Sequence, residues 1–125
     1  MTDNDYKNKL SEEAYKVCRL AATERPFTGI YNDHWEAGEY CCACCEEPLY
    51  LSTTKFNAGC GWPSFFEALA EKVKEKIDLS HGMSRVEIIC ANCDSHLGHV
   101  FDDGPEPTGK RHCVNSLSLQ FKVDK

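Results

Sequence analysis

The stretch YCCACCEEPLY, residues 40–50, places four cysteines within five consecutive positions. Two overlapping C-x-x-C pairs can be read in it, Cys41 with Cys44 and Cys42 with Cys45. Two turns with paired thiols, one on each of two hairpins, can build a closed four-thiolate zinc site. The second turn, and the choice between the two pairs, must come from elsewhere in the chain.

A second C-x-x-C occurs in CANCDSHLG, residues 90–98, and it selects the pair Cys42 and Cys45. When Cys42 is placed opposite Cys90, neighbouring residues match as well. The frame that starts at Cys41 matches the two cysteines and little else. The matched pairs are Ala43 with Ala91, Cys45 with Cys93, Glu46 with Asp94, Leu49 with Leu97, and Glu39 with Glu87.

Four thiolates suit borderline-soft Zn²⁺ far better than Ca²⁺ or Mg²⁺, which prefer oxygen ligands. A closed site has no open coordination position, so its role is predicted to be structural. A competing local site, C-x2-C-x2-H-x2-H, would add His96 and His99 to the second pair. That site leaves little chain to close around a metal and no role for the first cluster. The predicted ligands are Cys42, Cys45, Cys90 and Cys93.

Length and charge limit the number of domains, the partners and the location that can be expected. The 125 residues are expected to form one domain, 1–125, with residues 1–22 as an N-terminal arm that carries a helix. The formal charge of -6 argues against nucleic acid as a partner, and no apolar run approaches the ~20 residues of a membrane span. The polar N-terminus does not read as a signal peptide, so a cytoplasmic location is expected. Nine cysteines in a reducing compartment indicate metal binding or thiol chemistry.

Hydrophobic periodicity predicts two helices. Residues 11–22 have Ser11 as a cap and an apolar face that includes Cys18, a candidate core residue. A second helix is predicted to begin at Ser64, three residues before Glu67. Its apolar stripe would consist of Phe66, Leu69, Ala70, Val73 and Ile77.

The remainder is predicted to be β-structure. Residues 85–90 and 111–121 have β-rich or alternating character, and residues 102–109 are rich in turn-forming residues. Alternate residues of the last strand would share one face, with its apolar end in the core and its polar end beside it. These residues are Arg111, Cys113, Asn115, Leu117, Leu119 and Phe121.

That face makes Cys113 a candidate nucleophile, because a cation such as Arg111 lowers the pKa of a nearby thiol. A plain core cysteine is the alternative. Cys60 lies between two glycines and would be accessible to a partner thiol, or it is an ordinary loop residue. His96 and His99 would transfer protons near neutral pH, or they are surface histidines. Trp62 would line an apolar pocket or simply pack.

Together these segments resemble the methionine sulfoxide reductase B family, which reduces the R epimer of methionine sulfoxide. The resemblance rests on GCGWPSF (59–65), HGMSRVEIICANCDSHLGHVFDDGPEPTGKRHCVNS (81–116) and the paired C-x-x-C, and it covers about Thr23 to Phe121. HLGHVF followed by R-x-C-x-N-S is far more specific than a lone C-x-x-C. The family implies a mainly β fold, with two antiparallel sheets in a partly open barrel, helices at the N-terminal side and a structural zinc site.

The resemblance also implies roles for single residues. Cys113 matches the catalytic cysteine, Cys60 the resolving cysteine, and Trp62 the aromatic residue that receives the sulfoxide methyl group. The polar groups around the sulfoxide oxygen match His96, His99 and Asn115, the supporting charged residues match Asp103 and Arg111, and the zinc ligands match Cys42, Cys45, Cys90 and Cys93.

The chemistry implied by the resemblance is a thiol cycle. The Cys113 thiolate attacks the sulfoxide sulfur while His99 delivers a proton to the oxygen, and methionine leaves a sulfenic acid behind. Cys60 then forms a disulfide with Cys113, which thioredoxin reduces. The expected substrate is methionine-R-sulfoxide, free or in oxidised proteins, and the expected state is a monomer.

Some positions depart from the family pattern. His112 replaces the commoner Tyr and is expected to point away from Cys113, and Asn57 and Ala58 replace the commoner Asp-Ser. The extra thiols Cys41 and Cys44 are expected to pack, or to offer a second redox route when zinc is lost. Two rival functions are a non-catalytic zinc module that binds a protein partner, and a general thiol oxidoreductase or peroxide sensor.

Overall fold

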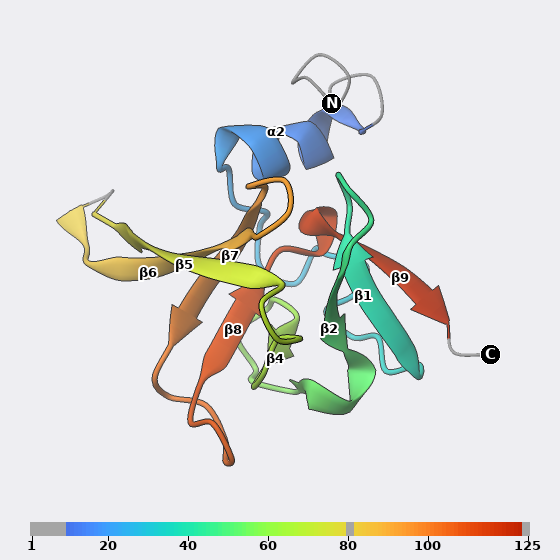
Figure 1. Ribbon diagram of the computed structural model, residues 1–125, viewed down its shortest axis with the longest axis vertical. Helices are drawn as coiled ribbons and strands as arrows, with labels where there is room; N and C mark the ends of the chain where they lie inside the picture. The colour runs from blue at the N-terminus through green and yellow to red at the C-terminus, as the bar shows by residue number, and fades with distance from the viewer. Residues whose placement is uncertain (1–9, 80–81, 124–125) are drawn as a thin grey trace.

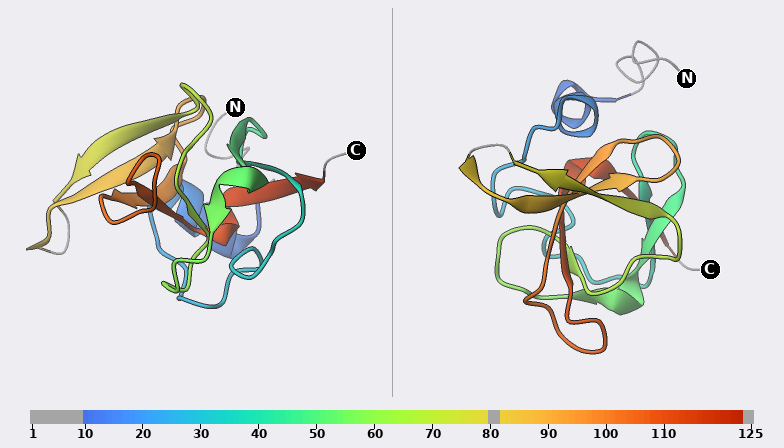
Figure 2. Two further views of the ribbon diagram at one scale, coloured as in Figure 1. Left: turned by 90° about the horizontal axis from the view of Figure 1, so that it is seen from below. Right: turned by 60° about the vertical axis from the view of Figure 1, so that its left-hand side comes forward.

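The computed structural model describes residues 10–79 and 82–123, which form a mainly β structure with one α-helix (Figure 1). A three-stranded sheet has the order β2-β1-β9, and a six-stranded sheet has the order β3-β4-β8-β7-β6-β5. All strand pairs are antiparallel, and the two sheets do not close (Figure 2), so the expected partly open architecture is confirmed. The elements are α2 (Glu12–Leu20), β1 (Gly38–Cys42), β2 (Pro48–Leu51), η1 (Ser52–Thr54), β3 (Lys55–Phe56), β4 (Ser64–Phe65), β5 (Val73–Asp78), β6 (Arg85–Cys90), β7 (His96–Phe101), β8 (Arg111–Val114), η3 (Ser116–Ser118) and β9 (Leu119–Val123).

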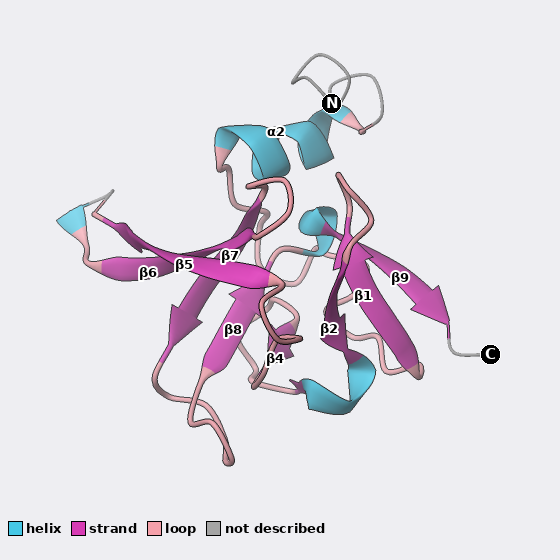
Figure 3. Ribbon diagram, in the orientation of Figure 1, coloured by secondary structure: helices cyan, strands magenta, loops and turns pink. Residues whose placement is uncertain are grey.

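The predicted N-terminal helix is confirmed as α2. The Ser11 hydroxyl accepts a hydrogen bond from the main-chain N–H of Ala14 at 3.1 Å, which satisfies a donor that the helix leaves unpaired. Val17 and Cys18 are buried on the inner face, so Cys18 is a core residue as expected. The helix ends at Leu20, and it lies over the end of the molecule where the turns after β1 and β6 emerge (Figure 3).

The second predicted helix is wrong. Ser64 belongs to the short strand β4, and the segment that follows turns at Glu71, whose φ is 63°, before it enters β5. Val73 of β5 pairs with Cys90 of β6, and Ile77 is exposed rather than part of a buried stripe. Pairing with β6 therefore overrides the helical periodicity, and the charged residues of β5 suit an exposed edge strand.

The predicted strand 85–90 is confirmed as β6, whereas the predicted strand 111–121 is divided. β8 ends at Val114 in the six-stranded sheet, η3 makes a corner, and β9 continues in the three-stranded sheet. The expected single face from Arg111 to Phe121 therefore does not exist. The chain instead uses this corner to join the two sheets around one core.

The core lies between the two sheets and is rich in aromatic side chains. Tyr50 stacks on Phe65 with ring centroids 4.3 Å apart, and its hydroxyl lies 2.9 Å from Nδ1 of His112. His112 is therefore buried on the opposite face of β8 from Cys113, as the strand alternation predicted. Other fully buried side chains are Tyr40, Leu49, Ile88, Leu97 and Val114.

Candidate active site and metal site

Two like-built turns bring four cysteines together, one turn after β1 and the other after β6. In the first, Glu46 donates its N–H to the carbonyl of Cys42 at 2.8 Å, and in the second Asp94 donates to the carbonyl of Cys90 at 2.9 Å. Glu46 and Asp94 both have a positive φ, 67° and 63°. The two turns therefore share the same hydrogen bond and backbone conformation in the frame in which Cys42 corresponds to Cys90.

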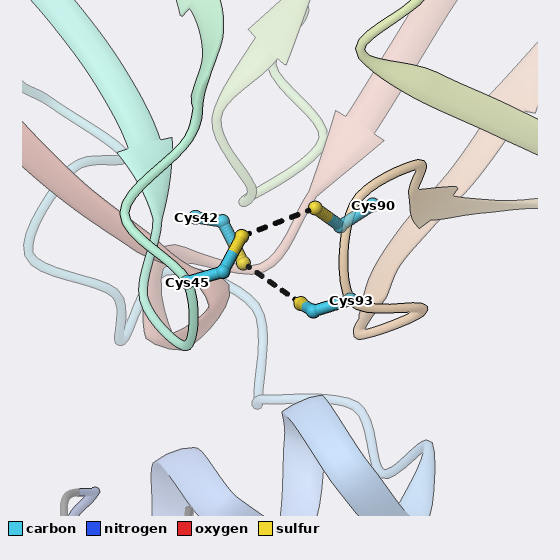
Figure 4. A group of neighbouring side chains, drawn as sticks. All are labelled: Cys42, Cys45, Cys90 and Cys93. Carbon is cyan, nitrogen blue, oxygen red and sulfur yellow. Dashed lines mark hydrogen bonds between the residues drawn. The ribbon is translucent and has the colours of Figure 1, made fainter. Parts of the chain in front are cut away.

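The four thiol sulfurs of these turns lie within 4.8 Å of one another (Figure 4). Cys42 Sγ is 3.6 Å from Cys93 Sγ, and Cys45 Sγ is 3.6 Å from Cys90 Sγ. Thiolates bound tetrahedrally at about 2.3 Å from one zinc ion would lie about 3.8 Å apart. The geometry and the donor set therefore fit a metal ion with a closed four-thiolate shell, and the four cysteines of this group are those of the predicted frame.

The extra thiols of the first cluster, Cys41 and Cys44, are fully buried and are not members of this group. Cys44 borders the group, because its side chain hydrogen-bonds with Cys42 and Cys93 as well as with Cys18 of α2. The alternative local site is not formed among the described residues, because the thiols of Cys90 and Cys93 group with the first C-x-x-C turn and neither histidine belongs to that group.

A cavity of about 260 Å³ lies beside β7 and β8. The cavity combines two thiols, a histidine, two arginines, an amide and two aromatic rings. Its lining residues are Thr23, Cys60, Trp62, Arg85, Gly98, His99, Phe101, Arg111, Cys113 and Asn115.

Strand register explains why the reactive residues meet. Cys113 of β8 lies directly opposite His99 of β7 and opposite Ser64 of β4. Directly opposite residues in antiparallel strands project to the same face, so these three side chains form one row. Gly98 permits the close approach of the strands, because a Cβ there would lie 1.9 Å from the carbonyl oxygen of Cys113.

The two thiols in the cavity are in direct contact. Cys60 Sγ lies 3.8 Å from Cys113 Sγ and 3.3 Å from Ser64 Oγ. The contact with Cys113 lowers the pKa of Cys60 to about 5, and the same contact together with burial raises the pKa of Cys113. Arg111 lowers the pKa of both thiols. At Cys113 the contact with Cys60 and burial outweigh this effect, so the pKa of Cys113 is raised and not lowered as the sequence suggested.

Each of the two predicted histidines is held by a carboxylate. His99 donates through Nε2 to Asp78 at 2.8 Å, and His96 Nδ1 lies 2.6 Å from Glu87 Oε2. Burial lowers the pKa of His96, although Glu87 acts in the opposite direction. Nε2 of His96 is buried without a hydrogen-bond partner in the part of the chain that the structure describes. His99 lines the cavity, and the His96 ring lies beside it with centroids 5.6 Å apart.

Trp62 and Asn115 are tied to one segment of main chain. The Trp62 indole donates to the carbonyl oxygen of Glu24 at 3.0 Å, and the N–H of Glu24 donates to Asn115 Oδ1 at 2.9 Å. The other end of the Asn115 amide donates to the carbonyl of Leu97. The Glu24 carboxylate accepts from the N–H of Leu117, and burial raises its pKa. Both ends of the side chain of Asn115, a predicted site residue, are thus bonded to main chain. These bonds hold Asn115 in place in the wall of the cavity.

Arg111 is held in place at the cavity edge. Its guanidinium donates to the carboxylate of Asp103 at 2.9 Å and 3.3 Å, and it lies 4.4 Å from the centre of the Phe101 ring. Asp103 is exposed and does not line the cavity, so it supports the predicted site through Arg111. The structure therefore brings all eight predicted catalytic and substrate-binding residues to one region, either in the cavity wall or directly behind it.

Several residues of the site are absent from the sequence-based prediction. Arg85 lines the cavity, and Asp78, Glu87 and Glu24 bind residues that line or support it. The alternation of β6 places Arg85 and Glu87 on one face, and this signal was available in the sequence. Asp78 directly follows Ile77, the last residue of the apolar stripe assigned to the wrong helix, and no signal pointed to it.

Comparisons with known proteins find similarity over most of the chain. The SelR domain model matches residues 10–123. A peptide methionine sulfoxide reductase MsrB of Alteromonas mediterranea is 59% identical over 123 residues, covering 98% of this chain and 87% of the relative. The MsrB of Hahella chejuensis is 57% identical over 121 residues, covering 96% and 87%.

A solved structure, the 'Yippee-like' domain of Mis18, has the same fold at 14% identity. Its TM-score is 0.58, and the match covers 72% of this chain and 99% of that domain. This likeness concerns the fold alone. Within the ranges 10–79 and 82–123, no helix has the length and apolar character needed to cross a membrane.

Proposed function

The chain belongs to the methionine-R-sulfoxide reductase B family, and on this premise we propose that it reduces methionine-R-sulfoxide through a Cys113 sulfenic acid and a Cys60–Cys113 disulfide. It is an oxidoreductase of the peptide methionine sulfoxide reductase class, and its substrate is the oxidised methionine of proteins. The observation that carries the mechanism is the 3.8 Å contact between the two thiol sulfurs in the wall of the cavity.

The thiol pair supplies the nucleophile. Moving one proton from Cys113 to the Cys60 thiolate, across the contact, leaves a thiolate on Cys113. The positive charge of Arg111 favours that thiolate. The Cys113 sulfur then attacks the sulfoxide sulfur, and a proton passes to the sulfoxide oxygen as the S–O bond weakens.

His99 is the proton donor in this proposal. It lies directly opposite Cys113 across β7 and β8 and lines the same cavity, so it can reach an oxygen on the sulfur under attack. The hydroxyl moves from the sulfoxide to Cys113 as a sulfenic acid, and methionine departs with the sulfur electron pair. His96, behind His99, and Asn115 complete the polar side of the cavity.

Cys60 closes the cycle. Its thiol attacks the Cys113 sulfenic acid, water leaves, and a disulfide forms with no large movement, because the sulfurs are already in contact. A dithiol protein of the thioredoxin type then reduces the disulfide. The Cys60 side chain is partly exposed and is flanked by Gly59 and Gly61, both with positive φ, which supports access for such a partner.

Trp62 gives the cavity its apolar wall. Because its indole N–H is bonded to the Glu24 carbonyl, the ring is fixed and presents carbon rather than a donor to the substrate. A sulfoxide methyl group against this wall leaves the oxygen facing the polar side with His99. Only one epimer can satisfy both contacts while its sulfur faces Cys113, which accounts for selectivity between the epimers, and the family indicates that the accepted epimer is R.

We assign zinc to the four-thiolate site formed by Cys42, Cys45, Cys90 and Cys93, since borderline-soft Zn²⁺ suits such a closed shell. The metal would supply structural cross-linking of the two turns, and the reaction itself is carried out by side chains of the cavity. A monomer in the cytoplasm, where thiols remain reduced, fits this chemistry.

A single-turnover experiment tests the mechanism. Zinc-loaded, reduced protein is mixed with the R epimer of a blocked methionine sulfoxide without reductant, and methionine and disulfides are measured after quenching. We expect one methionine per chain and a Cys60–Cys113 disulfide. Cys60→Ser should give one methionine and a sulfenic acid on Cys113 that dimedone traps, while Cys18→Ser should behave as wild type. Turnover with no change at Cys113 would overturn the mechanism.

A further inference from the structure

The end of the β5–β6 hairpin where the chain passes from β5 to β6 carries a group that contacts the candidate proton donor. Asp78 and Arg85 lie directly opposite each other at this end of the pairing. Oδ2 of Asp78 accepts from Nε2 of His99 at 2.8 Å and from the Arg85 guanidinium at 3.4 Å. One carboxylate oxygen therefore joins the proton donor of β7 to an arginine that lines the cavity.

Asp78 differs from its neighbours on the edge strand. The four residues before it, 74–77, are exposed, whereas the Asp78 side chain is only 18% exposed. The His99 side chain is 11% exposed, so the contact between them is largely shielded from water. A shielded carboxylate–histidine contact is stronger and better oriented than a surface pair.

The contact determines which ring nitrogen is available. A carboxylate accepts, so Nε2 of His99 carries the hydrogen that points to Asp78. When the ring takes up a second proton, that proton goes to Nδ1, the nitrogen that Asp78 does not bind. The hydrogen bond thus fixes the ring orientation as well as the tautomer of the neutral form.

Resting on the proposed function, we propose that Asp78, braced by Arg85, is the positioning residue for His99 and makes Nδ1 the nitrogen that gives its proton to the sulfoxide oxygen. Arg85 has the second task of keeping the carboxylate in place as the substrate fills the cavity. Neither residue touches the reacting atoms in this account, and both act through His99.

Other charged and titratable groups around His99 do not provide this contact. Glu87 of β6 is bonded to His96, whose ring neighbours His99 on β7. Cys113 lies opposite His99 on β8, and Arg111 on the same strand is bonded to Asp103. Asp78 is therefore the carboxylate bonded to His99 among the side chains that the structure describes.

The test compares Asp78→Asn with Glu75→Gln, a carboxylate-to-amide change at an exposed position of the same strand. Long-range ¹H–¹⁵N NMR of the zinc-loaded protein reports the His99 tautomer, and kinetics with the R epimer give kcat, KM and the pH profile. Wild type and Glu75→Gln should show the Nε2–H tautomer. Asp78→Asn should lose that preference, lower kcat by about a hundredfold and leave KM nearly unchanged. Arg85→Lys, which retains a cation, should have a smaller effect than Arg85→Ala.

The outcomes separate the two proposals. If wild type reduces neither epimer, the proposed function fails. If wild type is active but Asp78→Asn keeps its kcat and pH profile, or if wild-type His99 is the Nδ1–H tautomer, this inference alone fails. A loss of kcat in Asp78→Asn with an unchanged tautomer also overturns it, because the loss would then not act through His99.

Discussion

Glu46 and Asp94 occupy the same place in two separate turns, where each has a positive φ and donates its N–H to the cysteine four residues before it. Non-glycine residues rarely adopt this conformation, and Asp is among those that tolerate it. The repeated geometry shows that the two C-x-x-C turns are built alike and face one another. The pairing of Cys42 with Cys90 is thus a property of the backbone as well as of the sequence.

This pairing predicts which cysteines bind the metal. Cys45→Ser should lose most of its zinc and unfold far more easily, because structural zinc contributes on the order of 10 kcal/mol to folding. Cys41→Ser, at a buried position outside the sulfur group, should keep its zinc. Metal content after gel filtration and a chelator competition measure this. Zinc loss in Cys41→Ser with retention in Cys45→Ser would contradict the assignment.

The contact between Cys60 and Cys113 predicts reciprocal effects on reactivity. In the reduced protein Cys60 should be alkylated first at mildly acidic pH, because the contact with Cys113 lowers its pKa to about 5. Cys113→Ser should raise the pKa of Cys60, and Cys60→Ser should lower the pKa of Cys113. Each change removes the hydrogen bond between the two thiols, which is the largest cause of both pKa shifts. Iodoacetamide labelling across pH, read by peptide mass spectrometry, tests both. Titration of each thiol independent of the other would refute the coupling.

Gly98 predicts a steric limit on the active site. Gly98→Ala would place a Cβ 1.9 Å from the Cys113 carbonyl oxygen, so β7 and β8 would have to separate. A displacement of about 1 Å at reacting groups costs roughly a hundredfold in rate, so reductase activity should fall by about that factor. In Gly109→Ala the new Cβ meets nothing within 4 Å, and activity should be retained despite the strained φ. Equal activity of the two variants would show that the alignment of His99 with Cys113 does not depend on close contact between β7 and β8.

His112 predicts a pH dependence of stability. Burial, with a smaller effect of Lys110, lowers the pKa of His112 to about 4. An unfolded histidine titrates near 6.5, so between about pH 6.5 and 4 the unfolded state binds more protons. Stability contributed by His112 is therefore complete above about pH 6.5 and falls with decreasing pH, by roughly 3 kcal/mol in all.

His112→Phe isolates this effect. The substitution removes the partner of the Tyr50 hydroxyl and should lower stability at every pH, but with a flatter decline towards acid than in wild type. Urea unfolding of both zinc-loaded proteins at several pH values gives the two slopes. Parallel slopes would mean that the His112 pKa is not displaced by folding.

The grouping of the candidate site residues was easier to predict from the sequence than the secondary structure. The four clustered cysteines were singled out by an internal repeat, and Cys60, Trp62, His99 and Cys113 were singled out by motifs whose residues the structure brings to one cavity. The segment that begins at Ser64 was misassigned because its periodicity matches a helix, while pairing of β5 with β6 is a long-range effect.

Two of the supporting residues, Asp78 and Glu24, could not have been predicted from spacing. Asp78 reaches His99 only because β5, β6 and β7 are aligned in one register. Glu24 binds Trp62 and Asn115 through its main chain, which its side-chain type does not reveal. Such contacts depend on how distant segments of the chain pack together, so a local sequence pattern cannot predict them.

Reductase activity on the separated R and S epimers of a blocked methionine sulfoxide, with dithiothreitol as reductant, tests the central claim most directly. We predict turnover of the R epimer alone, abolished in Cys113→Ser and retained in Cys60→Ser, because dithiothreitol can reduce the Cys113 sulfenic acid in place of Cys60. No turnover of either epimer by zinc-loaded protein, or equal turnover of both, would contradict the account.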